Sequence, residues 1–497
     1  MRPSVVALDR LRIGTPKHEQ IAEGIASEIR RGRLKPGARL PSSRALAKEL
    51  CVNRGTVNAA LAELAAQGWI QTLPARGTFV REQLDLPPRR SQQRRAPTGP
   101  RPLGFSLRED PYQLTLARAI PQDQLVLTGG IPDPRLFPNE LLARAYRRAL
   151  RRRGAELLDY GDPRGCLALR KALITMLNEA RGLSASESEI LVTRGSQHAI
   201  WLAAHSLLGP GDRVGVEQFG YPPAWDALRT TGATLVPLPV DDEGVQVEAV
   251  ERALDAGPLK AIYLTPHHQY PTTVALSEAR RLRLLDLSRR QRIALLEDDY
   301  AHEFHYEGRP RLPMARADES GQVVYIGTLS KILSPGLRIG FAVAPAPLIE
   351  RMALARSPMD RQGDQVAEAA VAELIEDGEV ARHVRRMRST YKERCDVLIE
   401  ALANTLGDHL TFRAPSGGMS LWVKVRGARP EAWASAARQR GVIFRPGSEL
   451  TLGNDRVPFV RMGFTRLSPP EILRAVSLAR TAFHEVRGQT EQTPVRG

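Results

Sequence analysis

Short apolar runs that alternate with helical stretches constrain the fold of residues 105–485 more than any other feature. The runs are EILVT, DRVGVE, LKAIYLTP, RIALLEDDY and VVYIGTLS. Strands separated by helices favour parallel pairing, because a crossover between parallel strands needs a dozen or more residues. The pattern therefore predicts an α/β domain with a largely parallel sheet. We expect ligand-binding residues just past the carboxyl ends of these strands.

The first eighty residues follow a mainly helical pattern. Ile21, Ile25 and Ile29 recur every four residues and Gly32 follows them, which predicts an amphipathic helix that ends at the glycine. SSRALAKELCVNRGTVNAALAELAAQG predicts two short helices joined as in a helix-turn-helix, and WIQTLPARGTFV predicts a two-stranded hairpin. Residues 12–80 are therefore predicted to form a winged helix.

Positive charge is concentrated near the N-terminus. The chain has a net charge of +16; residues 1–80 hold 13 Lys/Arg and 6 Asp/Glu, and residues 81–101 hold 6 Arg and 2 Asp/Glu. This asymmetry indicates a polyanionic partner, although a merely basic surface is the alternative. Residues 81–104 are rich in Pro, Arg and Gln and are predicted to be an extended, flexible linker to a domain spanning 105–490.

Polar side chains on the predicted helices and wing suit double-stranded operator DNA. A helix that enters the major groove N-terminus first would present Arg54 and Asn58 to base edges, and Ser42 and Thr56 would suit phosphates. Arg76 at the wing tip would contact the DNA backbone or minor groove. A small helical dimerisation module is the alternative. The predicted DNA-binding residues are Ser42, Arg44, Arg54, Thr56, Asn58 and Arg76.

One lysine, Lys331, is enclosed by small and apolar residues in TLSKILSPGLRIG (328–340). Thr328, Ser330 and Arg338 supply two hydroxyls and a guanidinium, which suit a phosphate group. A partly desolvated lysine has a lowered pKa and can form an aldimine, a Schiff base, with an aldehyde. Pyridoxal 5'-phosphate (PLP) carries both an aldehyde and a phosphate, and it is the predicted cofactor.

Further residues after strands complete this predicted site. A carboxylate suits the pyridine nitrogen of the cofactor, a phenol its ring oxygen, and an aromatic ring its face. The turn at 195–197 precedes a helix, so its backbone N–H groups suit the phosphate. Each feature alone fits an ordinary cap or surface residue, but their order predicts a site. The residues are Ser196, Gln197, Tyr221, Asp298 and Tyr300.

Other classes of site and location are not expected. Cys51, Cys166 and Cys395 are far apart, so neither a disulfide framework nor a metal-binding spacing follows from them. His267 and His268 are expected to line a polar turn without a metal. No apolar run reaches about 18 residues and the N-terminus lacks a signal-peptide core, so a cytoplasmic location is predicted.

Three motifs in the first eighty residues, LPSSRALA, VNRGTV and RGTFV, resemble the GntR-type winged-helix domain. The resemblance implies that Arg44 and Arg54 contact operator DNA. Asn58 stands where some members of that family have another arginine.

The larger region resembles the aspartate-aminotransferase family of PLP proteins (fold type I). Besides the site above, the matching motifs are GGIPDPRLFP, LDYGDPRGCLALR and PFVRMGF. The fusion of the two parts resembles the MocR group of bacterial regulators across nearly all 497 residues. This resemblance implies a head-to-tail homodimer in which Tyr160 reaches the phosphate of the partner subunit. It also implies that Arg461 binds the carboxylate of an effector.

One motif departs from the aminotransferase pattern. The usual Asn-Pro-Thr-Gly turn is replaced within TPHHQYPTTVAL, where Tyr270 precedes Pro271 and Thr273 stands in place of glycine. The HQ-aromatic-P form is typical of the regulators. We therefore expect a PLP-dependent DNA-binding regulator that senses PLP or an amine or amino-acid effector through the aldimine at Lys331. An aminotransferase with an appended DNA-binding head and a cofactor reservoir without specific DNA binding are the alternatives.

Overall fold

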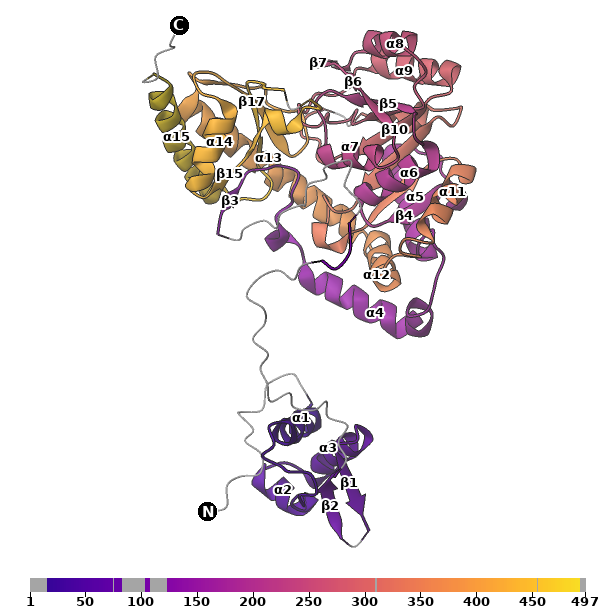
Figure 1. Ribbon diagram of the computed structural model, residues 1–497, viewed down its shortest axis with the longest axis vertical. Helices are drawn as coiled ribbons and strands as arrows, with labels where there is room; N and C mark the ends of the chain where they lie inside the picture. The colour runs from indigo at the N-terminus through magenta and orange to yellow at the C-terminus, as the bar shows by residue number, and fades with distance from the viewer. Residues whose placement is uncertain are drawn as a thin grey trace. The chain divides into compact units, whose positions relative to one another are not determined.

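The computed structural model describes residues 16–74, 76–82, 103–107, 123–308, 311–453 and 455–491. The chain divides into two units, Met1–Arg108 and Glu109–Gly497 (Figure 1). Most of the predicted linker at 81–104 lies outside the described residues. Within the described ranges, no helix is both long and apolar enough to cross a membrane.

Three helices and a hairpin make up the N-terminal unit. Ile21, Ile25 and Ile29 are buried on one face of the first helix, as the four-residue spacing predicts. Leu46, Val57, Ala60 and Leu64 are buried on the next two helices. The elements are α1 (Lys17–Arg30), α2 (Ser43–Glu49), α3 (Arg54–Ala66), β1 (Ile70–Leu73) and β2 (Gly77–Val80).

Side chains cap the two helices of the helix-turn-helix. The Ser42 hydroxyl accepts a hydrogen bond from the Ala45 N–H at 3.2 Å, and Asn53 Oδ1 accepts one from the Gly55 N–H at 2.8 Å. Such caps satisfy N–H groups that have no partner within the helix. The predicted wing is confirmed as an antiparallel pair in which Ile70 is opposite Val80.

A seven-stranded sheet organises the larger unit, in the order β4-β12-β11-β10-β9-β5-β6. Every strand runs in the same direction except β12, which pairs antiparallel with both β4 and β11. The predicted, largely parallel sheet is therefore confirmed. The strands are β4 (Ile190–Thr193), β5 (Arg213–Glu217), β6 (Thr234–Leu238), β9 (Ala261–Leu264), β10 (Ala294–Asp299), β11 (Val323–Thr328) and β12 (Gly340–Val343).

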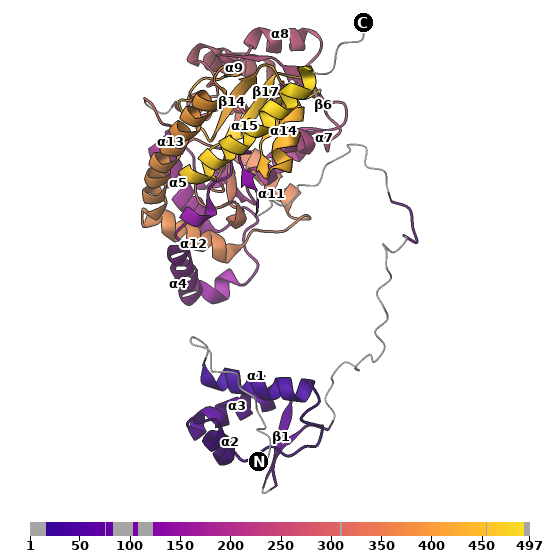
Figure 2. The same ribbon diagram turned by 90° about the vertical axis from the view of Figure 1, so that its left-hand side faces the viewer.

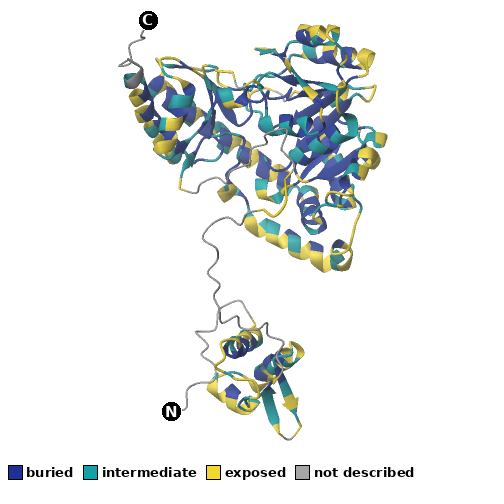
Figure 3. Ribbon diagram, in the orientation of Figure 1, coloured by how far each residue is buried: buried dark blue, intermediate teal, exposed yellow. Residues whose placement is uncertain are grey.

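Helices cover both faces of this sheet, so its strands are largely buried, except the edge strand β6 (Figures 1 and 3). Alternate residues of a strand face opposite cores: Tyr263 and Leu296 lie in one cluster, Ile262 and Leu295 in the other. The α-helices that lie between β3 and β13 in the chain are α4 (Asn139–Leu157), α5 (Leu167–Arg181), α6 (Ser196–Leu207), α7 (Pro222–Arg229), α8 (Val247–Asp255), α9 (Glu278–Gln291), α10 (Met314–Ala317), α11 (Ala346–Arg356), α12 (Gln365–Glu376) and α13 (Glu379–Leu406).

The C-terminal part of this unit forms a second, smaller lobe (Figure 2). Its four-stranded sheet has the order β13-β14-β17-β16, and β15 pairs parallel with β3, which precedes the large sheet in the chain. The elements are β3 (Leu125–Val126), β13 (Leu410–Thr411), β14 (Ser420–Val425), α14 (Pro430–Gln439), β15 (Val442–Ile443), β16 (Arg445–Pro446), β17 (Phe459–Gly463) and α15 (Pro469–Glu491).

The remaining elements are short. They are a hairpin, β7 (Val240–Asp241) and β8 (Gly244–Val245), and the 3₁₀ helices η1 (Pro134–Leu136), η2 (Glu187–Glu189), η3 (Pro335–Leu337) and η4 (Gly447–Leu450).

Candidate functional site

A cavity of about 200 Å³ brings together residues from both lobes of the larger unit. Five residues of the predicted site line it: Ser196, Tyr221, Asp298, Tyr300 and Lys331. Asp298, Tyr300 and Lys331 lie at or just past the carboxyl ends of β10 and β11, as expected for an α/β sheet. The other lining residues are Thr128, Gly129, Gly130, Ile131, Thr265, Tyr270 and Arg445.

Lys331 is the only lysine that lines this cavity. Burial lowers the pKa of its amine to about 8. The positive charges of Arg461 and Arg338 act in the same direction, and the charge of Asp298 opposes them. A substantial fraction of Lys331 is therefore a neutral amine near pH 8, which is the form that attacks an aldehyde.

Asp298 presents an unsatisfied carboxylate oxygen. Its Oδ2 accepts a hydrogen bond from the Tyr263 hydroxyl at 2.7 Å, but its buried Oδ1 has no partner. Burial raises the pKa of this carboxyl to about 6. A buried acceptor without a partner is costly, so the site suits a cationic N–H donor, such as a protonated pyridine ring. The donor set around the cavity thus fits PLP.

Three tyrosines form an aromatic wall. The ring of Tyr270 makes edge contacts with Tyr221 at 5.4 Å and with Tyr300 at 6.1 Å between centroids. Burial raises the pKa of Tyr221 to about 12 and also raises that of Tyr300, so both phenols are neutral donors near pH 7. The wall offers ring faces and hydroxyl groups to a planar ligand.

The turn before α6 is built for close approach. Gly195 has a φ of 77°, which favours glycine, and a Cβ on Gly340 of β12 would lie 2.5 Å from the Gly195 carbonyl carbon. Ser196 then begins the helix at the cavity wall, where backbone N–H groups suit an anion. The Gln197 side chain instead donates to the Pro223 carbonyl at 2.6 Å, so only the backbone of Gln197 fits this role.

The other predicted phosphate ligands lie outside the lining of the cavity. Ser330 is buried and its hydroxyl has no partner. Thr328 Oγ1 accepts from the Ser330 N–H at 3.1 Å. Arg338 is exposed, and its Nη2 donates to the Arg194 carbonyl at 2.8 Å, beside Gly195. Arg338 therefore lies beside the turn at 195, and Ser330 offers a buried hydroxyl that has no hydrogen-bond partner.

Arg461 of β17 is buried and has N–H groups without a hydrogen-bond partner. Its Nη1 donates to the Thr128 carbonyl at 2.6 Å, while Nε and Nη2 have no partner. The guanidinium carbon lies 4.2 Å from the centre of the Tyr270 ring. Buried donors without a partner suit an anion, and a guanidinium binds carboxylates in a bidentate manner. This geometry is compatible with the predicted role in carboxylate binding.

Sequence reasoning missed several residues of this site. Arg445 of β16 is paired opposite Arg461 and lines the cavity, but nothing in the local sequence marks it. Thr128 to Ile131 form another wall. The motif GGIPDPRLFP, which begins at Gly129, is part of the resemblance to aminotransferases, but it did not indicate that this segment lines the cavity.

Tyr160 does not line the cavity of its own chain. It is 72% exposed, and the Arg361 guanidinium carbon lies 3.8 Å from the centre of its ring. Its predicted contact therefore requires a second copy of the chain.

In the winged helix, Ser42, Arg44, Arg54, Asn58 and Arg76 are exposed and Thr56 is half-buried. Arg54 is the first residue of α3, and its Nε donates to Ser43 Oγ at 3.2 Å. This hydrogen bond holds the Arg54 side chain beside the start of α2. The predicted DNA-binding side chains are thus available for contact from the two helices and the wing.

Two family models match this chain. Residues 17–80 match the bacterial regulatory proteins of the gntR family, and residues 130–477 match aminotransferase class I and II. Together they confirm the predicted fold class, a winged helix followed by an aminotransferase-type α/β domain.

Relatives with both parts align over almost the whole chain. The "probable rhizopine catabolism regulatory protein MocR" of Rhizobium meliloti is 32% identical over 96% of this chain and 96% of its own length. The transcriptional regulator TauR of Rhodobacter capsulatus is 32% identical over 92% of this chain and 94% of its own. Among solved structures, a multiple substrate aminotransferase of Thermococcus profundus is 29% identical, with a TM-score of 0.69, and covers 74% of this chain and 93% of its own.

Proposed function

The chain belongs to the MocR group of GntR-type transcriptional regulators, and on this basis we propose that Lys331 holds PLP so that the larger domain senses the cofactor or an amine effector. The observation that supports this most is the placement of Lys331 in one cavity with the unpaired carboxylate oxygen of Asp298. When bound, PLP supplies an aldehyde that takes up primary amines and a ring that withdraws electrons.

The residues of the cavity have separate roles in this proposal. Lys331 would hold the aldehyde group of the cofactor, and Asp298 would keep a proton on its pyridine nitrogen. Tyr300 would donate its hydroxyl to the ring oxygen, and Tyr221 would offer its ring to the face of the cofactor. The turn at 195–197, with Thr328, Ser330 and Arg338, holds the phosphate, because hydroxyl, guanidinium and backbone N–H donors all suit its oxygens.

The effector is an amine or amino acid. Arg461 binds its carboxylate, because Nε and Nη2 of that side chain are buried and have no other partner. Displacement of the Lys331 nitrogen by the effector's amine would leave a free, partly buried lysine amine in the cavity. The free lysine would change the relative stability of different arrangements of the two lobes. The free energy that couples effector binding to DNA binding must come from this change in relative stability.

The rest of the molecule follows the same proposal. Residues 12–80 bind operator DNA, 81–104 form a linker, and 105–490 form the sensing domain with a large lobe over about 150–370. Two copies form a head-to-tail dimer in which Tyr160 contacts the phosphate held by its partner. We infer that Arg44, Arg54, Asn58 and Arg76 contact the operator directly, with Ser42 and Thr56 at phosphates.

Transamination is the second candidate function, and an intact lysine, aspartate and arginine set favours it. The position of Tyr270 weighs against it. Tyr270 packs its ring on Arg461, and its backbone N–H donates to Thr265 Oγ1 at 2.9 Å. Because the residue is a tyrosine, no side-chain amide is present at this position to bond the ring oxygen of the cofactor. Sustained turnover of an amino donor with a keto acceptor at about 10 per second would favour the enzyme.

The test measures operator binding by the full-length protein in three forms: freed of PLP, reloaded with PLP, and reloaded in the presence of candidate amines. We expect the affinity or the spacing of bound half-sites to change between these forms. Lys331→Ala should bind the operator with the same affinity and half-site spacing in all three forms. It should also lack the visible absorption band of the wild type. Identical binding by all wild-type forms would refute the sensing role, and a persistent band in Lys331→Ala would refute the assignment of the lysine.

A further inference from the structure

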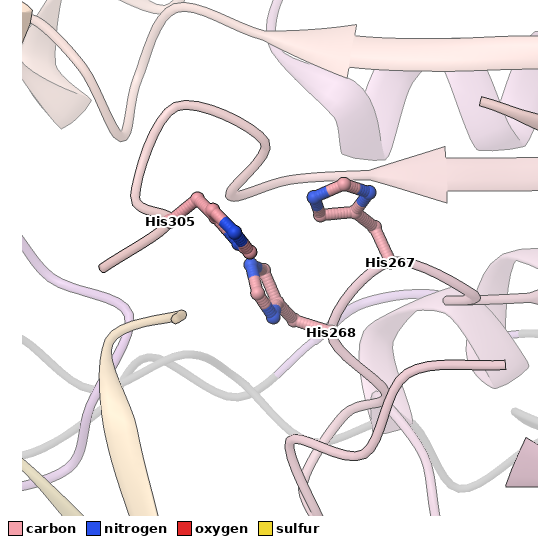
Figure 4. Close-up of side chains that lie close together, drawn as sticks. All are labelled: His267, His268 and His305. Atoms are coloured by element: carbon pink, nitrogen blue, oxygen red, sulfur yellow. The ribbon is translucent and has the colours of Figure 1, made fainter. Parts of the chain in front are cut away.

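A cluster of histidines lies beside the cofactor pocket, on two loops that follow strands. His267 and His268 come after β9, and His305 comes after β10. One ligand nitrogen from each of the three lies within 4.8 Å of the others, and their rings turn toward one another (Figure 4). His267 and His268 meet edge to face, with ring centroids 4.7 Å apart.

Four of the six ring nitrogens of this cluster have no protein partner. His267 Nδ1, both ring nitrogens of His268, and His305 Nε2 are buried and form no hydrogen bond. Burial lowers the pKa of His267 to about 4 and lowers those of His268 and His305, so the rings are neutral near pH 7. Buried nitrogens without a partner are costly, and four in one place require an explanation. Neutral imidazole is also the form that binds metals.

Backbone contacts hold the two loops that carry the cluster in place. A Cβ on Gly417 would lie 2.4 Å from His268 Cε1, so only glycine allows this approach. His305 forms a bridge with Gly417, and the Gly418 N–H donates to the Phe304 carbonyl at 2.7 Å. Both histidine loops are therefore fixed against the segment that enters β14, so only the imidazole rings would have to turn to reach one ion.

From this geometry we propose that His267, His268 and His305 bind a divalent transition-metal ion of the zinc class. Imidazole nitrogens are preferred ligands of such ions. Three nitrogens that share one zinc ion at about 2 Å lie roughly 3–3.5 Å apart. Nitrogens as far apart as 4.8 Å would therefore have to close by roughly 1–2 Å. Water or a small anion would complete the tetrahedron.

A second set, formed by His267, Asp299 and His302, is a poorer metal site. His302 Nδ1 and Asp299 Oδ2 already lie in hydrogen-bond contact at 2.9 Å, and Asp299 Oδ2 also accepts from the Tyr325 hydroxyl at 2.8 Å. His302 Nδ1 and Asp299 Oδ2 are therefore satisfied without a metal, whereas Asp299 Oδ1 is buried without a partner. His302 instead packs on His267, with ring centroids 4.6 Å apart, and helps to orient it.

The site would tie together loops that also build the cofactor pocket. His268 lies two residues before Tyr270, and His305 lies five residues after Tyr300. The metal would therefore tie the loops of these two cavity residues to each other. This inference is independent of whether PLP is bound or sensed.

The test titrates the full-length chain, freed of any affinity tag and stripped with a chelator, with Zn²⁺ alone in a calorimeter. We expect one ion per chain. His305→Ala should weaken binding more than about 100-fold, because removal of a ligand exceeds the 10- to 100-fold effect of an outer-shell change. His484→Ala, which removes an exposed histidine on α15, should bind as the wild type does.

Circular dichroism should show that His305→Ala is folded, and His305→Gln provides a second variant of similar size. The wild-type titration does not depend on either variant. Absence of a stoichiometric site in the wild type would overturn the proposal. So would wild-type affinity in His305→Ala, or a loss of binding confined to His302→Ala.

Discussion

Lys331 depends on its neighbours for its chemistry, because burial and two arginines lower the pKa of its amine to about 8. Below this pH most of the side chain is ammonium, which cannot attack an aldehyde. We predict that the rate at which the cofactor-free chain takes up PLP rises with pH, with a midpoint near 8, as followed by visible absorbance in a stopped-flow instrument.

The same experiment on Asp298→Asn tests the cause. The negative charge of Asp298 raises the pKa of Lys331, so its removal should lower the midpoint. A rate independent of pH in the wild type, or a midpoint that moves upward in the variant, would contradict this account.

Thr273 has a φ of 65°, which a β-branched residue rarely adopts. We predict that Thr273→Gly stabilises the protein, because a non-glycine residue in this region costs about 1–3 kcal/mol and glycine gives back roughly 0.5–1 kcal/mol in backbone entropy. The measurement is the midpoint of thermal unfolding. Thr272→Gly is the matched control and should destabilise, because it removes a hydroxyl that donates to Gln269 Oε1 at 2.7 Å. A lower midpoint for Thr273→Gly would show that this turn is not strained.

Among the secondary-structure elements, helix α3 leads to a prediction about operator binding. Arg54→Ala should weaken binding to the specific operator by about 1–3 kcal/mol, the usual range for an arginine that reads a base. Arg54→Lys is the sharper variant, since it keeps the charge but loses the forked donors. It should lower the ratio of specific to nonspecific affinity while the salt dependence stays unchanged. An unchanged ratio in both variants would mean that Arg54 does not read bases.

The elements also show how far the sequence predicts the fold. All five apolar runs became strands of the large sheet, because burial on both faces leaves a continuous apolar signal. The position of β12 was not predictable, since an antiparallel strand inserted between β4 and β11 depends on contacts distant in sequence. The same limit applies to the site. Lys331 and Asp298 follow strands and were found, whereas Arg445 reaches the cavity only through its pairing with Arg461.

At the scale of the whole molecule, the exposed position of Tyr160 predicts that each cofactor site needs two chains. A Tyr160→Ala homodimer should hold PLP about 10-fold more weakly or worse, because it lacks a hydrogen bond to a charged group. Mixed dimers of Tyr160→Ala with Lys331→Ala chains contain one intact site. They should therefore recover wild-type affinity at half the stoichiometry in an equilibrium titration. Mixed dimers that bind no better than the Tyr160→Ala parent would place Tyr160 outside the site.

The segment from Thr128 to Ile131 has a further consequence for the molecule. It belongs to the first stretch of the larger unit that the structure describes, and it follows β3, which pairs with β15. Its Thr128 carbonyl binds Arg461, and a Cβ on Gly463 would lie 2.1 Å from Gly129 Cα. A ligand that draws Arg461 away from Thr128 would therefore remove one of the contacts that hold this segment against β17. The first described stretch of the larger unit would then be less restrained at the end that is nearer, in sequence, to the DNA-binding unit.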